Sequence, residues 1–345
     1  MNSTIRDVAA YSGLSLGTIS KYINGGSVKG KNRKKIEEAI QKLNYKPNNI
    51  AKGLRNSRTF TVGVLLPSFK SSFYGAIISS IEEYLLPLGY KVIASEYHEN
   101  EEMEIEKIKF FLYHMVDGVV ILPWSTSGEQ IDVINENKTP FVIIDQLLQG
   151  HMADGVILDN EAAIEEPVET LIKMGHRNIA IITGEMVQYT AMGRFAGYEK
   201  AMNHHHIPIK KEYIRSGSYK IDGGYAAALD LFRLKKPPSA LVVCNYDMTI
   251  GAVFAAHYLQ VNIPNDISFI GFDDSPITNM VDPPLSIISQ PMIEMGRGAA
   301  SLLFKRIKGD YTDYPELIMH KANMKLTESV KPIQKSKLSK LNQMV

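Results

Sequence analysis

Compact apolar strands alternate with amphipathic helices along most of the chain, from residue 60 onward. Strands are predicted at 61–67, 90–95, 118–123, 140–145, 179–183, 240–244 and 267–271. Helices are predicted at 73–86, 101–115, 161–174, 193–203, 222–233 and 248–260. This alternation is typical of parallel sheets covered by helices on both faces. Two such runs predict two doubly wound α/β lobes, with a ligand pocket between them at the carboxyl ends of the strands.

The first sixty residues carry a charge that the rest of the chain does not. They contain twelve Lys or Arg residues against three Asp or Glu residues, so their net charge is +9, whereas the whole 345-residue chain has +1. This asymmetry indicates a basic module for a polyanion, joined to a near-neutral or acidic body. A solvated basic face is the simpler interpretation of one short run, but it suits sixty residues less well.

Three short helices are predicted in the basic segment. Ser3 or Thr4 can cap the first helix, which Gly13 ends, and Ser15 is a candidate N-cap for the second. The tripeptide at 24–26, Asn-Gly-Gly, is a strong stop signal, and a third helix is predicted at about 31–43. A helix, a short turn with glycine and a second helix form the helix-turn-helix pattern.

Residues 4–24, TIRDVAAYSGLSLGTISKYIN, resemble the helix-turn-helix of the LacI/GalR family of bacterial transcription regulators. The segments YKPN at 45–48 and IAKGLR at 50–55 are similar to the end of that domain and the family's hinge helix. Short motifs of the body follow the same family in order, namely Asp117-Gly118, Asp159-Asn160, MGHR at 174–177, IPND at 263–266, GFDD at 271–274 and Gln290-Pro291. Each motif is weak alone, but their order and spacing across residues 3–330 are specific.

The resemblance implies an all-α helix-turn-helix DNA-binding domain followed by two parallel-sheet lobes like those of periplasmic binding proteins. The expected domains are a helix-turn-helix domain at 1–47, a hinge helix or linker at 48–59, a two-lobe effector-binding and dimerisation domain at 60–330, and a flexible basic tail at 331–345.

The second helix is expected to contact DNA. Ser15, Thr18 and Ser20 offer hydroxyls to phosphates. By the resemblance, Leu16, Gly17 and Lys21 face the major groove. The family usually has Arg at position 21, and Lys lacks its planar fork, so guanine discrimination should be softer. The predicted DNA-binding residues are Ser15, Leu16, Gly17, Thr18, Ser20, Lys21, Asn24, Asn48 and Leu54.

Leu54 matches the family's minor-groove wedge, an apolar side chain that kinks DNA by entering a base step. Its alternative role is that of a linker leucine covering a lobe interface. Gly53 lowers helix propensity by roughly 1 kcal/mol relative to Ala, so the hinge helix is expected to need DNA and a partner hinge.

The resemblance implies a sugar-type or similar small polar effector. Asp145 and Asp273 follow strands and can each accept two hydroxyls, and Arg194 can supply paired donors. Helix capping is the competing role for the two acids, and an interlobe salt bridge is that for Arg194. Either Asn245 or Asp247 corresponds to the family's hydroxyl-binding residue. The predicted effector-binding residues are Phe73, Trp124, Asp145, Arg194, Tyr219, Asn245, Asp247 and Asp273.

Other site classes are disfavoured. A single cysteine, Cys244, excludes a disulfide framework and a Cys-rich zinc site. The run His204-His205-His206 is expected to be a polar loop, because no Cys or acidic ligand lies at suitable sequence spacing. Neither a metal nor a cofactor is expected. Pro167 should kink the helix that contains it, because it removes a backbone hydrogen bond.

The sequence lacks a membrane-length apolar run and an N-terminal signal peptide, so a cytoplasmic protein is expected. Phosphate-cradle and nucleophile-elbow motifs are absent, so an enzyme is not expected. The leading hypothesis is a transcription regulator, a repressor, that binds an inverted-repeat operator as a homodimer under control of a sugar-type effector. The alternative is a solute-binding protein of sugar transport. A phosphoprotein corepressor in place of the sugar stays open.

Overall fold

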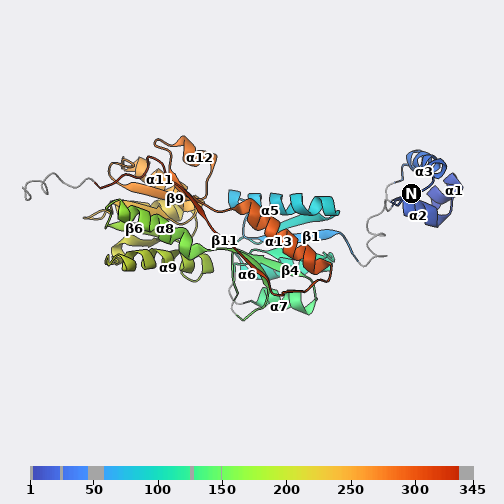
Figure 1. Cartoon of the computed structure of the whole chain (residues 1–345), viewed down its shortest axis with the longest axis horizontal. Helices are drawn as coiled ribbons and strands as arrows, with labels where there is room; N and C mark the ends of the chain where they lie inside the picture. Colours follow the sequence, from blue (N-terminus) through green and yellow to red (C-terminus); the bar gives the residue numbers. More distant parts are fainter. Residues whose placement is uncertain (1–2, 24–25, 46–57, 125–127, 149, 334–345) are drawn as a thin grey trace, which may run out of the picture. The chain divides into compact units, whose positions relative to one another are not determined.

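The computed structural model describes residues 3–23, 26–45, 58–124, 128–148 and 150–333. The chain divides into two compact units, Met1–Thr59 and Phe60–Val345 (Figure 1). The predictions for Asn24, Asn48, Leu54 and most of the hinge and the basic tail lie outside the described residues. Within the described part, no helix is long and apolar enough to cross a membrane.

The first unit is a bundle of three helices, α1 (Ile5–Ser12), α2 (Leu16–Ile23) and α3 (Gly30–Lys42). Their apolar faces meet in a small core, in which Val8, Ile19, Ile36 and Ala39 are fully buried. The predicted three-helix arrangement is therefore present.

Local signals set the ends of these helices. Thr4 caps α1 through a capping box, in which its backbone N–H donates to the Asp7 carboxylate at 2.7 Å. Gly13 ends the helix in the left-handed conformation, with φ of 65°, which a residue without Cβ adopts at little cost.

The second unit contains two six-stranded sheets. The first has the order β11-β5-β4-β3-β1-β2, and the second has the order β12-β10-β9-β8-β6-β7. Strands of the first sheet are β1 (Thr61–Leu66), β2 (Lys91–Glu96), β3 (Gly118–Ile121), β4 (Phe141–Ile144), β5 (Asp154–Leu158) and β11 (Leu317–His320). Those of the second are β6 (Ile179–Thr183), β7 (Ile214–Ser216), β8 (Ala240–Val243), β9 (Ser268–Phe272), β10 (Ser286–Ser289) and β12 (Asn323–Lys325).

The two sheets share one strand order, so each lobe repeats the other's topology. All their strand pairs are parallel except β10 with β12. Equivalent positions in the two lobes therefore lie at equivalent ends of strands, and the carboxyl ends of β4 and β9 correspond.

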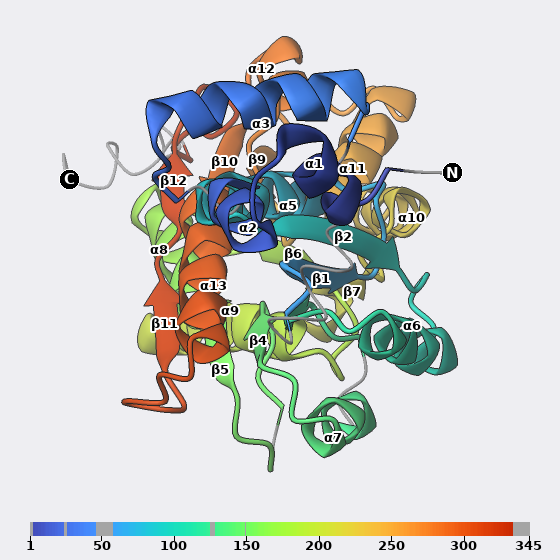
Figure 2. The same cartoon turned by 90° about the vertical axis from the view of Figure 1, so that its right-hand side faces the viewer.

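Helices cover both faces of each sheet. In the first lobe, α5 (Ser72–Leu85) packs with α13 (Met292–Ile307), and α6 (Glu101–Tyr113) with α7 (Glu129–Glu136) on the opposite face (Figure 2). In the second lobe, α8 (Asn160–Lys173) packs with α9 (Tyr189–His204), and α10 (Ile221–Phe232) with α11 (Tyr246–Tyr258). A short helix, α12 (Pro276–Met280), follows β9. The predicted fold of two doubly wound lobes is thus confirmed.

Close helix packing depends on one glycine in each lobe. A Cβ at Gly296 of α13 would lie 1.9 Å from the Ser80 hydroxyl oxygen on α5. A Cβ at Gly197 of α9 would lie 2.1 Å from the Glu161 carbonyl oxygen on α8. Neither position leaves room for a side chain.

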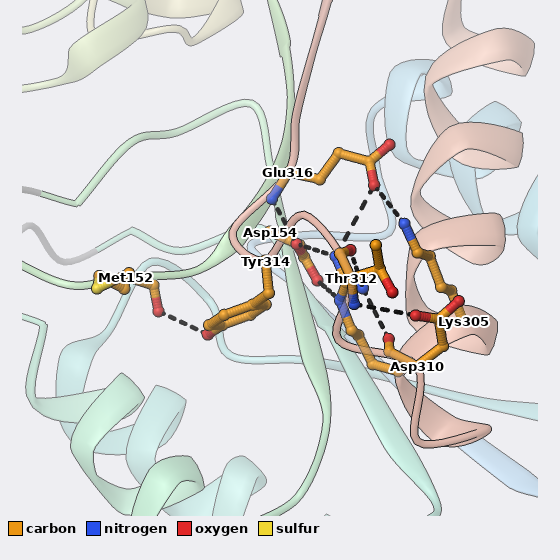
Figure 3. Close-up of polar contacts among 8 residues, drawn as sticks. Met152, Asp154, Lys305, Asp310, Thr312, Tyr314 and Glu316 are labelled. Atoms are coloured by element: carbon orange, nitrogen blue, oxygen red, sulfur yellow. Dashed lines mark hydrogen bonds and ion pairs between the residues drawn. The ribbon is translucent and has the colours of Figure 1, made fainter.

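The chain passes between the lobes three times, after β5, after β10 and between β11 and β12. As a result, α13 and β11 belong to the first lobe although they come late in the sequence. A buried ion pair joins α13 to the first sheet: Arg306 of α13 donates to both Asp154 oxygens of β5, at 2.6 and 2.9 Å. The Glu316 backbone N–H before β11 donates to the same carboxylate at 2.7 Å (Figure 3).

Pro167 lies inside α8, which runs without a break from Asn160 to Lys173. A break at Pro167 is therefore not seen, and the kink predicted there stays a prediction. Pro167 is buried with the apolar face of α8, so packing on the second sheet holds the helix together despite the missing N–H donor.

Candidate functional site

The helix α2 presents most of its predicted DNA-contacting residues to solvent. Ser15, Leu16, Gly17 and Lys21 are exposed, whereas Ile19 between them is buried in the bundle core. Leu16 is an apolar side chain with 46% of its surface exposed. One face of α2 therefore packs in the bundle core, and the other face is exposed to solvent and can contact a partner.

Two of the predicted phosphate-binding hydroxyls contact each other. The Ser15 and Thr18 hydroxyl oxygens are 2.9 Å apart, and the Thr18 backbone N–H donates to the Ser15 hydroxyl oxygen at 3.3 Å. Ser15 therefore acts as the N-cap of α2. Thr18 and Ser20 are half-buried, and the aliphatic part of Lys21 lies against Gly26.

A pocket of about 630 Å³ lies between the two lobes of the second unit. All eight predicted effector-binding residues line it, namely Phe73, Trp124, Asp145, Arg194, Tyr219, Asn245, Asp247 and Asp273. The first three come from the first lobe and the others from the second. A ligand in this pocket would contact both lobes.

Asp145 and Asp273 occupy equivalent positions in the two lobes. Each follows a strand directly, β4 and β9 respectively, and each adopts a left-handed conformation, with φ of 66° and 64°. Non-glycine residues in this conformation are strained and cluster at ligand sites. Neither caps a described helix, because the structure describes none between β4 and β5 and Ser275 is the N-cap of α12. Their competing structural role is thereby removed.

Burial controls the charge of this acid pair. It raises the pKa of Asp145 to about 6 and that of Asp273 to about 6, against an ordinary value of 3.8. The nearby positive charge of Arg194 opposes the rise in both cases. Asp145 is partly exposed as a residue, but its Oδ1 is buried and accepts no hydrogen bond from the described residues.

Arg194 is held inside the second lobe and is only 3% exposed. Its Nε donates to the Asn160 side-chain oxygen at 2.9 Å, its Nη1 donates to the Cys244 carbonyl, and its guanidinium lies 4.2 Å from the centroid of the Phe272 ring. Among the described residues it forms no ion pair, so the alternative of an interlobe salt bridge is not seen.

Asn245 and Asp247 both line the pocket, but their side chains differ in the hydrogen bonds that they make within the protein. The Asn245 oxygen caps α11 by accepting from the Met248 N–H at 2.9 Å. The Asp247 carboxylate makes no hydrogen bond within the described chain, and burial and the charge of Glu99 raise its pKa. Asp247 is thus the freer of the two to bind a hydroxyl.

The aromatic lining comes from both lobes. Tyr219 is fixed by a 2.9 Å hydrogen bond between its hydroxyl and that of Thr190. Phe73 is 7% exposed and belongs mainly to the core of the first lobe, and Trp124 is half-buried.

Several lining residues were not predicted. Glu99, after β2, forms an ion pair of 2.9 Å with Lys220 of the second lobe across the pocket. Tyr74, Gln146, Gln188 and Gln290 also line it. Glu99 and Gln146 follow predicted strands, so the rule that ligands bind at the carboxyl ends of strands could have indicated them. Gln290 follows β10, which was not predicted.

The histidine run differs from its prediction. His204 is the last residue of α9 rather than part of a loop, and α8 brings Glu169 beside it. The Glu169 Oε1 lies 3.6 Å from His204 Nδ1 and 3.9 Å from His205 Nε2. No acidic ligand was expected from the sequence spacing, which did not show the acid that the neighbouring helix α8 supplies.

Comparison with known proteins decides the family. Residues 4–48 match the family model of bacterial regulatory proteins, lacI family, and residues 168–322 match that of a periplasmic binding protein-like domain. Catabolite control protein A of Priestia megaterium is 32% identical over 315 residues, which cover 91% of this chain and 95% of that protein. The chain belongs to the LacI family.

Solved structures agree with this assignment. A complex of the transcriptional regulator CelR with cellobiose is 26% identical, with a TM-score of 0.74, and covers 95% of this chain and 100% of that one. A Lac repressor dimer bound to operator and the anti-inducer ONPF is 24% identical, with a TM-score of 0.86 over 96% of this chain and 100% of that one, and shows the shared fold.

This LacI-family protein is therefore a DNA-binding transcription regulator. Two relatives that it matches over more than nine-tenths of their length are named HTH-type transcriptional regulators, and the transport alternative has no use for the lacI-type segment at residues 4–48. These and other relatives carry names of transcriptional regulators or repressors, none of which is the name of an enzyme.

Proposed function

We propose that this LacI-family regulator is a repressor whose operator affinity is set by a small hydroxylated effector bound between its lobes. The observation that carries the proposal is the pair Asp145 and Asp273, contributed by different lobes and set beside Arg194 in one pocket. Paired carboxylates and a guanidinium suit the hydroxyls of a polyol. The CelR neighbour was solved with a carbohydrate, cellobiose.

DNA contact is assigned to the exposed face of α2, with Leu16, Gly17 and Lys21 toward the major groove and Ser15, Thr18 and Ser20 toward phosphates. The basic charge of the unit supports this assignment, because phosphate neutralisation supplies most of non-specific affinity. One recognition helix reads only a few base pairs, so the regulator is proposed to bind an inverted repeat as a homodimer.

A binding experiment on promoter DNA tests the proposal. Purified protein should retard a fragment of its own promoter, and Lys21→Ala should cost about 1–3 kcal/mol of binding free energy and relax base preference. Lys42→Ala removes the same charge from an exposed position at the end of α3 and serves as the matched control. Equal losses in both variants would contradict the assignment of α2 to the groove.

Light scattering tests the homodimer. A species of twice the 38.5 kDa chain mass is expected. A stable monomer or tetramer would contradict this part of the proposal.

A further inference from the structure

Four of the residues that line the interlobe pocket each have a buried side-chain oxygen with no hydrogen-bond donor among the described residues. These oxygens are Asp145 Oδ1, Gln146 Oε1, Gln188 Oε1 and Gln290 Oε1. Three of these residues are glutamines that are 7–8% exposed, so water reaches them poorly. A buried acceptor without a partner costs free energy, which a ligand that brings donors would recover.

The orientation of two of these amides is fixed by their own donors. The Gln146 Nε2 donates to the Pro123 carbonyl at 3.0 Å, and the Gln290 Nε2 donates to Asp273 Oδ1 at 2.9 Å. Turning either amide over would bring its oxygen against another acceptor. The side-chain atoms of Gln146 and Gln290 that lack a partner are therefore acceptors.

The charges of the pocket lining are also unbalanced. Its carboxylates are Glu99, Asp145, Asp222, Asp247 and Asp273, against the cations Lys70, Arg194 and Lys220. Lys220 is paired with Glu99, Lys70 is exposed, and Arg194 faces two carboxylates. An anionic ligand group would meet Asp145 and Asp273 with one shared, already hydrogen-bonded cation between them.

We infer that the pocket selects a hydroxylated ligand that carries a protonated amine, and that it rejects phosphorylated and carboxylated sugars. An ammonium group has three N–H donors and no acceptor, so it matches the unpartnered oxygens, and its charge offsets the excess carboxylate. Hydroxyls on the same ligand are donors for the remaining oxygens. This inference rests on the proposed function of the pocket as the effector site.

A matched ligand panel tests the inference. Glucose, galactose and mannose are each compared with their 2-amino, 6-phosphate and uronic acid forms, by thermal shift and isothermal titration calorimetry on the full chain at pH 7.5. At least one amino sugar should raise Tm and bind at least tenfold more tightly than its neutral parent, with phosphates and acids weaker still. A phosphate or acid that binds as tightly as its amino counterpart, or no binding by any amino sugar, overturns the inference.

A variant separates charge from shape. Asp145→Asn keeps the size of the side chain but removes its charge, so the tenfold preference for the amine over the neutral sugar should disappear. Glu82→Gln, an exposed change on α5 outside the pocket, should keep the preference. An undiminished preference in Asp145→Asn contradicts the role of this carboxylate.

Operator binding by the ligand-free wild-type chain is measured on the same preparation. If the chain binds operator and no amino sugar binds, this inference fails while the proposed function stands. If it does not bind operator, the proposed function itself fails.

Discussion

At the scale of single residues, the proposed effector site contains residues whose backbone conformation and buried charge lower the stability of the folded chain. Asp145 and Asp273 combine a left-handed backbone with a carboxylate held in a buried place. Strain and desolvation of this kind persist where surrounding packing enforces them, and they are characteristic of functional sites. The strand pattern of the sequence could predict both residues, but not their strained backbone or the glutamine acceptors around them.

The acid pair should make stability depend on pH. Because the pKa of Asp145 is raised to about 6 in the folded protein, the folded state binds more protons than the unfolded chain between about pH 4 and 6. Its contribution to the free energy of unfolding therefore falls as pH rises through that window. Asp145→Asn should raise the free energy of unfolding of the ligand-free protein by about 1–2 kcal/mol at pH 7.5, with no gain near pH 4.

Urea unfolding at the two pH values measures this effect, with Glu82→Gln as the exposed carboxyl-to-amide control. A loss of stability in Asp145→Asn at pH 7.5 would mean that this carboxylate is a structural partner.

Gly17 offers a second test at this scale. A Cβ there would have no other heavy atom within 4 Å in the protein. Gly17→Ala should therefore stabilise α2 by about 0.5–1 kcal/mol through helix propensity. Operator affinity should nevertheless fall at least tenfold, because the missing side chain lets the backbone approach DNA.

Thermal unfolding and fluorescence anisotropy on one preparation give both quantities. Gly30→Ala, at an equally open position in the first turn of α3, is the control for operator affinity. Wild-type affinity in Gly17→Ala would show that the position does not approach the groove.

At the scale of elements, local patterns predicted those strands and helices whose periodicity is complete within one segment. The strand at 61–66 was predicted at 61–67 and the helix at 72–85 was predicted at 73–86, so each end agrees to within one residue. The helix α13 and the strand β11 were not predicted, and the return of both to the first lobe depends on contacts more than 150 residues away in sequence, such as Arg306 with Asp154. No local pattern carries that information.

The ion pair of Arg306 with Asp154 should supply much of the stability that holds α13 and β11 in the first lobe. Both side chains are at most 1% exposed, so removing Arg306 leaves a buried carboxylate without its cation, and removing Asp154 leaves Arg306 with only the longer 3.8 Å contact to Glu316. Asp154→Asn or Arg306→Met should each lower the free energy of unfolding by about 3–5 kcal/mol, and the double variant by less than the sum.

Urea titration checks this double-mutant cycle. Glu83→Gln breaks the exposed pair with Arg297, which has an N–O distance of 3.5 Å, and should cost below about 1 kcal/mol. Additive losses in the double variant would show that the two residues act independently.

At the scale of the whole molecule, regulation requires that a ligand distinguish two arrangements of the lobes. Asp145 belongs to one lobe and Asp273 to the other, and Glu99 and Lys220 already join them across the pocket. A ligand shifts such an equilibrium only by its differential affinity for the two arrangements. A molecule that binds both acids has that property, and one that binds a single lobe does not.

The most direct measurement is a titration of labelled operator with wild type and Asp273→Ala, with and without the tightest ligand of the sugar panel. The account predicts nearly equal operator affinity for the two proteins without ligand, and a change of operator affinity on adding ligand in the wild type only. If Asp273→Ala responds at the same ligand concentration as the wild type, the effector does not bind between these lobes.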